Sequence, residues 1–292
     1  MGSRVMNFEP VNKANYLRRR AVSAIMDSLC LLAAILGLVV LALIMYTLVS
    51  EGIAGLSLDA FFLPTRAPGQ PGGLANAIVG SLIQTGLGIA MGAPLGLAAG
   101  IYLAEVGRDH RFASVVRFVN DILLSAPSIL VGLFVYQIVV SPMHSFSALA
   151  GSIALALIAM PIVARTTEDI IKLVPHTFRE GSLALGARES TTIARVIVPA
   201  AFNGILTAIL LAVARIAGET APLIFTSLGS NIWSFDLTEP MASLPITIYR
   251  YAASPYADWT QLAWTGALII TVGVLALNIA SRWALAHSTR AR

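Results

Sequence analysis

Two charged side chains stand inside an apolar stretch, LAVARIAGETAPLIFT at 211–226, that has the character of a membrane helix. Arg215 and Glu219 are four residues apart, so they share one helix face. An arginine at the centre of a bilayer costs about 2.5–3.5 kcal/mol on insertion scales. Because a guanidinium binds oxyanions through parallel hydrogen bonds, the pair indicates either a structural ion pair or a site that an oxyanion passes.

Three features favour a translocation site over a purely structural pair. In the more stabilising helical pair the acidic residue precedes the basic one, and here the order is reversed. Glu219 also approaches the C-terminal end of its predicted helix, where the dipole disfavours a carboxylate. Pro222 frees the carbonyl of Gly218 and predicts a broken helix, which is typical of transport sites at membrane depth. We include Thr220, which lies inside this break, in the predicted substrate site.

Arg165 is a further candidate for contact with the substrate. It follows Pro161 in another apolar stretch, with Glu168 three residues on and Asp169 four residues on. An arginine that snorkels toward the membrane surface would give the same pattern, so this interpretation stays open. Asp121 is either a substrate contact or a charge favoured by a helix N-terminus.

The pairing of an arginine with a carboxylate bears on which oxyanion could be recognised. Sulfate at neutral pH offers only acceptors, whereas hydrogen phosphate keeps a proton that it can donate. We therefore expect a site with Glu219 to favour phosphate, because the carboxylate accepts that proton and repels sulfate. Sulfate, molybdate and phosphonate remain alternative substrates.

The composition identifies the elements that must position these charges. Of 292 residues, 57% are hydrophobic and 12% are charged, and the mean hydropathy is +0.80; soluble domains carry about 25% charged residues. These values exclude an ordinary soluble domain and predict an all-α integral membrane protein. The single cysteine, Cys30, excludes an internal disulfide and has no companion at metal-ligand spacing, so we expect no metal and no cofactor.

Six apolar segments are long enough to cross a bilayer, which takes about 20 residues. The predicted spans are 28–50, 74–104, 118–140, 148–173, 200–227 and 262–285. They make one six-helix transmembrane domain, 28–285, between an N-terminal segment, 1–27, and a tail, 286–292. The first apolar run exceeds the core of a signal peptide, about 7–15 residues, so we expect it to remain as a span.

Basic residues gather on one side of this predicted topology. Of the 19 lysines and arginines, 16 fall in or beside the two termini and the connections after the second and fourth spans. Arg66 and Arg250 lie on the other side. The positive-inside rule therefore predicts that both termini are cytoplasmic. Because topology accounts for the net charge of +4, we expect no nucleic-acid partner.

Glycines recur every four residues in the second predicted span. Their spacing puts them on one stripe of the helix and lets another helix approach closely. The stripe consists of Gly88, Gly92, Gly96 and Gly100. The sequence predicts tight helix packing here but leaves open whether the neighbour belongs to this chain or to a partner.

The longest inner connection, 172–202, is too polar to span a membrane and too apolar for a bare linker. Apolar residues recur in it at near-helical spacing, Gly186 divides it, and Pro199 marks the entry to the fifth span. We expect a helix, a glycine break and a second short helix.

This connection resembles the "EAA" signature of permease subunits of ATP-binding-cassette importers. The matching positions are Glu180, Gly181, Ser182, Gly186, Val196, Val198 and Pro199. Gly181 and Ser182 replace the two alanines of the signature, and valines replace its isoleucine and leucine. The resemblance implies a coupling loop, 174–199, that docks on a cytoplasmic ATPase. An amphipathic connector without a partner is the alternative.

Three stretches resemble the phosphate-transport permease family and are most similar to its A-type subunit. They are PSILVGL at 127–133, RIAGETAPLIFT at 215–226 and LPITIYRYA at 244–252, and the likeness covers about residues 72–285. It implies the type I importer permease (MetI-like) fold in a bacterial or archaeal inner membrane. It also implies a homologous second permease, two copies of an ATP-binding subunit, an external phosphate-binding protein, phosphate and membrane lipid as partners.

The chain itself lacks the means to bind ATP through a P-loop, which needs a lysine after a glycine. Its only lysines, Lys13 and Lys172, do not follow glycine. We therefore expect a transport subunit with no enzymatic activity, and ATP hydrolysis on a partner chain. An ion-driven transporter, or a channel without an ATPase, is the alternative from a different class.

Overall fold

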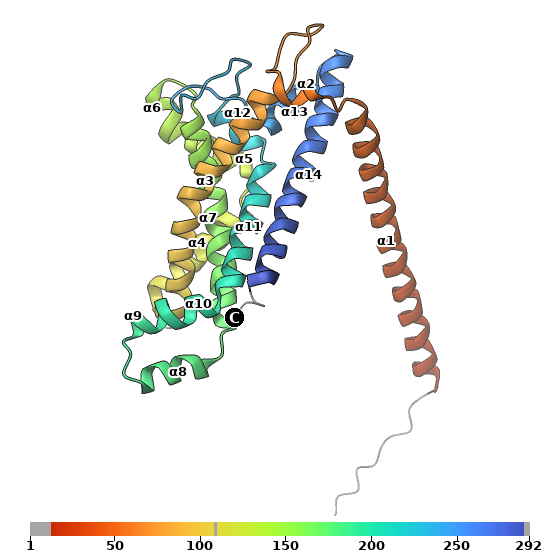
Figure 1. Ribbon diagram of the computed structural model, residues 1–292. Helices are drawn as coiled ribbons and strands as arrows, with labels where there is room; N and C mark the ends of the chain where they lie inside the picture. Colours follow the sequence, from red (N-terminus) through yellow and green to blue (C-terminus); the bar gives the residue numbers. More distant parts are fainter. Residues whose placement is uncertain (1–12, 108–109, 289–292) are drawn as a thin grey trace, which may run out of the picture. The chain divides into compact units, whose positions relative to one another are not determined.

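The computed structural model describes residues 13–107 and 110–288 and divides the chain into two compact units, 1–50 and 51–292. The described part of the first unit belongs to α1 (Lys13–Ala54; Figure 1). The side chains of α1 are exposed along almost the whole helix, and most of them are apolar. Of the segment predicted to precede the first span, 1–27, the described part, 13–27, is helical.

The described residues of the second unit form helices and connecting turns, which agrees with the predicted all-α fold. In chain order the helices are α2 (Leu58–Phe62), α3 (Ala75–Ile101), η1 (Tyr102–Val106), α4 (Arg111–Ser125), α5 (Ser128–Val135), η2 (Tyr136–Val140), α6 (Ser141–Met143), α7 (Ala148–Lys172), α8 (His176–Ala184), α9 (Glu189–Thr192), η3 (Ile193–Ile197), α10 (Val198–Ala200), α11 (Phe202–Ala217), α12 (Ala221–Thr226), α13 (Leu244–Ala252) and α14 (Ala257–Ser288). The segments labelled η are π-helical turns. Within this unit, α8 and α9 lie at one end and α6 and α13 at the other (Figure 1).

Four described helical segments are long and apolar enough to cross a membrane, and the number rises to six if each of two bent pairs is one span. The third predicted span, 118–140, is wrong as a continuous helix. The chain bends by 105° between Arg111–Ser125 and Ser128–Met143. Pro127 causes the bend, because it lacks an N–H and forces extended backbone at Ala126.

The fifth predicted span, 200–227, is also interrupted, and here the break was expected. α11 ends at Ala217 and α12 begins at Ala221. Pro222 lies in the first turn of α12, where its missing N–H leaves no hydrogen bond unmade. A further bend of 71° separates Glu189–Ala200 from Phe202–Ala217, so the chain turns as it enters α11.

α3 and α7 approach each other closely along the glycine stripe. A Cβ added at Gly92 would lie 2.7 Å from the carbonyl oxygen of Ala156, and one at Gly96 would lie 2.6 Å from that of Met160. Gly88 and Gly100 meet α7 in the same way. The neighbour that the sequence left open is therefore a helix of the same chain. The adjoining core consists of Ala93, Leu155, Ala159, Val163, Ala212, Ile216, Leu223 and Ile246.

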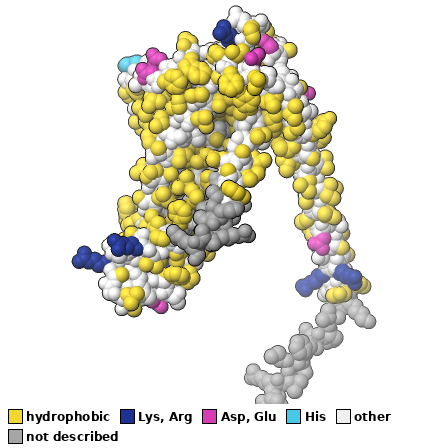
Figure 2. All heavy atoms as spheres, in the orientation of Figure 1, with side chains coloured by type: hydrophobic (Ala, Val, Ile, Leu, Met, Phe, Trp, Pro, Cys, Tyr) yellow, Lys and Arg dark blue, Asp and Glu magenta, His cyan; other side chains and the backbone are white. Residues whose placement is uncertain are grey.

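Side chains on the surface of the second unit are distributed as a membrane requires. In the view of Figure 2, apolar side chains cover the middle of the helices, and charged side chains gather at the two ends. Large apolar residues are exposed on several helices, among them Leu82 on α3, Phe134 on α5 and Leu275 on α14. Contact between this apolar surface and lipid has no hydrophobic cost, whereas its exposure to water would be unfavourable.

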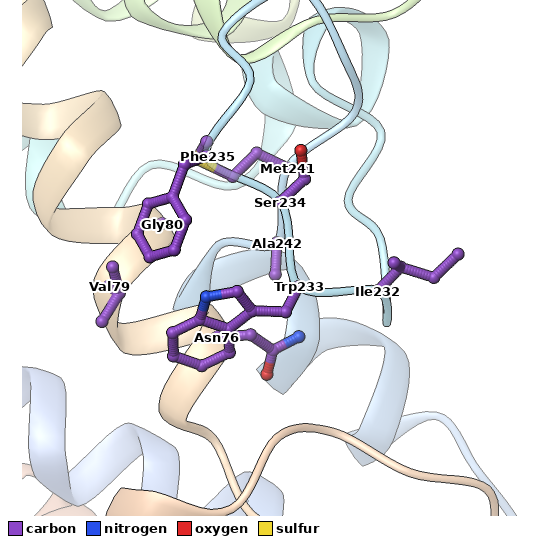
Figure 3. A pocket seen from close by; sticks show the side chains of 9 residues that line it. All are labelled: Asn76, Val79, Gly80, Ile232, Trp233, Ser234, Phe235, Met241 and Ala242. Carbon is purple, nitrogen blue, oxygen red and sulfur yellow. The ribbon is translucent and has the colours of Figure 1, made fainter.

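The connection between α12 and α13 is held against the first turns of α3. Asn76 Nδ2 donates to the Ser230 carbonyl at 3.5 Å, and Gln84 Nε2 donates to the Ala242 carbonyl at 3.2 Å. Gly80 leaves room for the Ala242 carbonyl. Figure 3 shows Trp233 beside Asn76 in the small pocket at this contact. The contact fixes one end of α3, and with it the glycine stripe.

The close packing of α3 on α7 leads to a stability prediction. We expect Gly92→Ala to lower the thermal unfolding midpoint, because the added methyl group would overlap the Ala156 backbone, and overpacking costs about 1–3 kcal/mol. Gly86→Ala is the matched control, since Gly86 is on the same helix and an added Cβ there meets no atom within 4 Å. Thermal unfolding of the purified protein in detergent measures both. Equal midpoints for the two variants would contradict the packing.

Candidate functional site

A cavity of about 160 Å³ lies where α4 bends into α5. The end of α4, the start of α5, one face of α7 and the last turn of α11 form its walls. It is lined by Leu123, Leu124, Ala126, Ser128, Val131, Ile158, Pro161, Ile162 and Arg215. Arg215 is the one charged member of this lining. An anion in the cavity would therefore meet a single guanidinium among apolar groups, where screening is weak and charge attraction is strong.

Arg215 is paired and yet accessible. Its Nη1 forms an ion pair with Oε1 of Glu219; the Arg215 side chain is 56% exposed and that of Glu219 is 6% exposed. The carboxylate of Glu219 is thus buried, whereas the guanidinium of Arg215 is exposed and keeps donors that an anion could use. Arg215 lies in the last turn of α11, where the dipole favours a cation, and Glu219 lies beyond the helix end. Glu219 still lies next to the negative, C-terminal pole of α11, so the predicted opposition between this dipole and the carboxylate stays a prediction.

The break between α11 and α12 sets the position of this pair. Thr220 immediately precedes α12, and its carbonyl accepts the Ile224 N–H at 3.2 Å. α5 packs directly against the break, because a Cβ at Gly132 would lie only 2.6 Å from Cα of Pro222. The structure therefore brings Arg215, Glu219 and Thr220 together at one break that is packed on α5.

Arg165 lies on α7, one turn beyond Ile162, but outside the lining of the cavity. Its Nε is 3.4 Å from Oδ2 of Asp169, and its Nη1 is 3.8 Å from Oδ1 of Asp121 on α4. All three side chains are about half exposed, so such pairs contribute only about 0–1 kcal/mol each. The structure joins Arg165 to Asp121 and not to Arg215.

The predicted coupling loop folds as two short helices around Gly186, as expected. Gly186 has φ of 80°, its N–H donates to the Leu183 carbonyl at 2.9 Å, and the Ala187 N–H donates to the Ser182 carbonyl at 3.2 Å. These two bonds form a Schellman turn at the end of α8, which favours glycine at this position because of the positive φ.

The remaining signature positions lie along the same loop. Glu180 and Gly181 are exposed, and a Cβ at Gly181 would meet no atom within 4 Å. The Ser182 hydroxyl lies 2.8 Å from that of Thr192 and so joins α8 to α9. Pro199 lies in the first turn of α10. The exposed face of α8 is free to meet another protein.

Two buried ion-pair clusters near α8 were missed from the sequence. Glu168 is 1% exposed and accepts hydrogen bonds from Arg117 Nε at 2.8 Å and Lys172 Nζ at 2.5 Å. Arg179 binds Glu105, and this carboxylate raises the pKa of Arg179 above its ordinary value. Of these pairs, only Glu168 with Lys172 could have been predicted from the sequence, because the acidic residue precedes the basic one by four positions on a helix. The other partners are distant along the chain.

The cavity leads to an accessibility prediction. In a Cys30→Ser background, we expect Ser128→Cys to react with a small hydrophilic thiol reagent, because this position lines the cavity beside Arg215. Ser152→Cys is the control, since Ser152 is fully buried on α7. Mass spectrometry of the labelled protein measures both rates, which should differ by about tenfold or more if burial protects the thiol. Equal rates would contradict the cavity.

Proteins of similar sequence are named as permeases of phosphate transport systems. The phosphate transport system permease protein PstA of Haemophilus influenzae is 50% identical over 269 residues, 92% of this chain and 95% of the relative. PstA of Yersinia pestis is 53% identical over 265 residues, 90% of each. A probable PstA of the archaeon Methanocaldococcus jannaschii is 41% identical over 215 residues, 73% of this chain and 76% of the relative.

Solved structures show the same fold at lower sequence identity. An inward-facing structure of the MetNI methionine ABC transporter matches with a TM-score of 0.59 at 18% identity, covering 73% of this chain and 92% of that chain. An amino acid ABC transporter matches with a TM-score of 0.54 at 19% identity, covering 71% and 90%. Residues 92–291 match the model of the binding-protein-dependent transport system inner membrane component. The chain therefore belongs to this family of membrane permeases.

Proposed function

We propose that this chain is the permease subunit of an ATP-driven importer of inorganic phosphate and forms half of the translocation pathway. The observation that carries the proposal is the half-exposed guanidinium of Arg215, at the end of α11. It lines a cavity at the α4–α5 bend that has no other charged residue in its lining. A bound oxyanion offsets the cost of keeping that charge at membrane depth. The relatedness to PstA proteins supports phosphate as the oxyanion.

Glu219 supports phosphate over sulfate within this proposal. Its buried carboxylate lies next to the Arg215 guanidinium, so an anion that reaches Arg215 also comes close to Glu219. Hydrogen phosphate can donate a hydrogen bond to that carboxylate. Sulfate has no hydrogen to donate and is repelled by it. In this proposal Thr220, the residue after Glu219 in the break, also contacts the ion, and the partly exposed Arg165, one turn beyond the cavity on α7, is the next cation on the route.

The chain works with partner proteins in this proposal. Both termini and the 174–199 loop face the cytoplasm, which agrees with the side on which basic residues gather. The exposed face of α8 around Glu180 docks on an ATPase, present in two copies. A homologous second permease completes the pathway and an external phosphate-binding protein delivers the ion. Closure of the ATPases moves the loop, and the spans then expose Arg215 to each side in turn.

A first prediction concerns Arg215. We expect Arg215→Gln to abolish ATP-dependent phosphate uptake by the complete transporter in liposomes. Loss of one charged hydrogen-bond partner costs about 1.5–3 kcal/mol, a loss of about 10- to 150-fold, and the anion also loses its counter-charge. The complex should still assemble. Arg66→Gln, in the connection after α2, is the control. Loss of assembly in Arg215→Gln would indicate a structural ion pair instead.

A second prediction concerns Glu219. We expect Glu219→Gln to reduce the selectivity for phosphate over sulfate by about tenfold or more, because the amide can donate a hydrogen bond to sulfate and no longer repels it. Competition of sulfate with labelled phosphate during uptake measures this ratio. A variant that transports sulfate no better and phosphate no worse than the native chain would refute the role of the carboxylate.

A further inference from the structure

The π-helical turn η1 releases a backbone carbonyl at the end of α3. The Gly107 N–H donates to the Tyr102 carbonyl at 2.8 Å, five residues back, so the Leu103 carbonyl loses the partner that an α-helix would give it. Arg117 of α4 replaces that partner, since its Nη2 donates to Leu103 O at 2.8 Å. The Nε of Arg117 donates to the buried Glu168 on α7 at 2.8 Å. One guanidinium therefore ties α4 to both η1 and α7.

A second arginine ties α8 to the same place. Arg179 Nε donates to both Glu105 oxygens, at 3.1 Å and 3.0 Å, and so holds α8 to η1. Its Nη1 donates to Val174 O at 2.7 Å and its Nη2 to Ile171 O at 3.1 Å, which caps the end of α7. The two charged side chains are only 11% and 8% exposed.

Apolar burial does not fix α8 in this position. None of the residues of α8 is buried, so the helix depends on polar attachments to the rest of the domain. The hydroxyl contact from Ser182 reaches only α9, which belongs to the same loop. Among the described residues, Arg179 is therefore the polar attachment that joins α8 to the membrane helices, and its planar fork sets an orientation as well as a contact.

We propose that Arg179 and Arg117 are positioning residues that lock α8 to the ends of α3, α4 and α7, so that displacement of α8 moves the α4–α5 bend. The far end of α4 supplies Leu123 and Leu124 to the cavity that Arg215 lines. A helix transmits a displacement along its axis because its backbone hydrogen bonds make it stiff. Without these two arginines, movement of α8 would be absorbed in its exposed loop. This inference rests on the proposed function.

The test is the number of phosphate ions imported per ATP hydrolysed by the complete transporter in liposomes. We expect Arg179→Gln, Glu105→Gln and Arg117→Gln each to lower this ratio by about tenfold, while ATP hydrolysis stays within about twofold of the native rate, because the link and not the ATPase is broken. The double variant Glu105→Gln/Arg179→Gln should be no worse than either single variant, since both break one link. Arg111→Gln, an exposed residue on α4, is the control.

Arg179→Lys keeps the assembly testable if a glutamine variant fails to fold. A lysine keeps the charge but cannot reach Glu105 and both helix carbonyls together, so we expect an intermediate ratio. The proposal would be overturned if Arg179→Lys imported as many phosphate ions per ATP as the native transporter. It would also be overturned if uptake and ATP hydrolysis fell in parallel in all variants. Absence of ATP-dependent phosphate uptake by the native complex would instead overturn the proposed function itself.

Discussion

The cost of holding a charge at membrane depth constrains the rest of this structure. Arg215 can occupy the end of α11 because the helix breaks there, Glu219 neutralises it, and the dipole at the end of α11 favours a cation. The bend of α4 into α5 opens a small cavity against the same side chain. Two prolines, Pro127 and Pro222, cause the interruptions, and α5 packs directly against the second one at Gly132.

Such interruptions need a rigid frame, which α3 and α7 supply. Their glycine stripe brings two long helices into backbone contact, so the bent elements have a fixed surface to pack against. At the end of that frame next to α8, two ion pairs, Arg117–Glu168 and Arg179–Glu105, lie beside a buried apolar cluster that includes Ala104 and Ile171. Ion pairs of this kind add little to stability but fix geometry, which suits a joint that must carry movement.

The local pattern of the sequence predicted the helical class, four of the six spans as long apolar helices, the glycine contact, the Gly186 turn and the break at Pro222. Each of these depends on residues that are near one another in the chain. The 105° bend at Pro127 was missed, because hydropathy is continuous across 118–140 and a proline inside a span indicates a kink without giving its angle. The partners of Arg117 and Arg179 could not be predicted, since they lie 51 and 74 residues away and meet only in the folded chain. The cavity around Arg215 likewise requires α4, α5, α7 and α11 to be placed in space.

A density map of the complete transporter, trapped with phosphate during turnover, tests the central claim most directly. The account predicts an anion in the cavity at the α4–α5 bend, within hydrogen-bond distance of the Arg215 guanidinium and next to Glu219. A map in which Arg215 stays bound only to Glu219, with the anion crossing elsewhere and protein closing off that cavity, would contradict it.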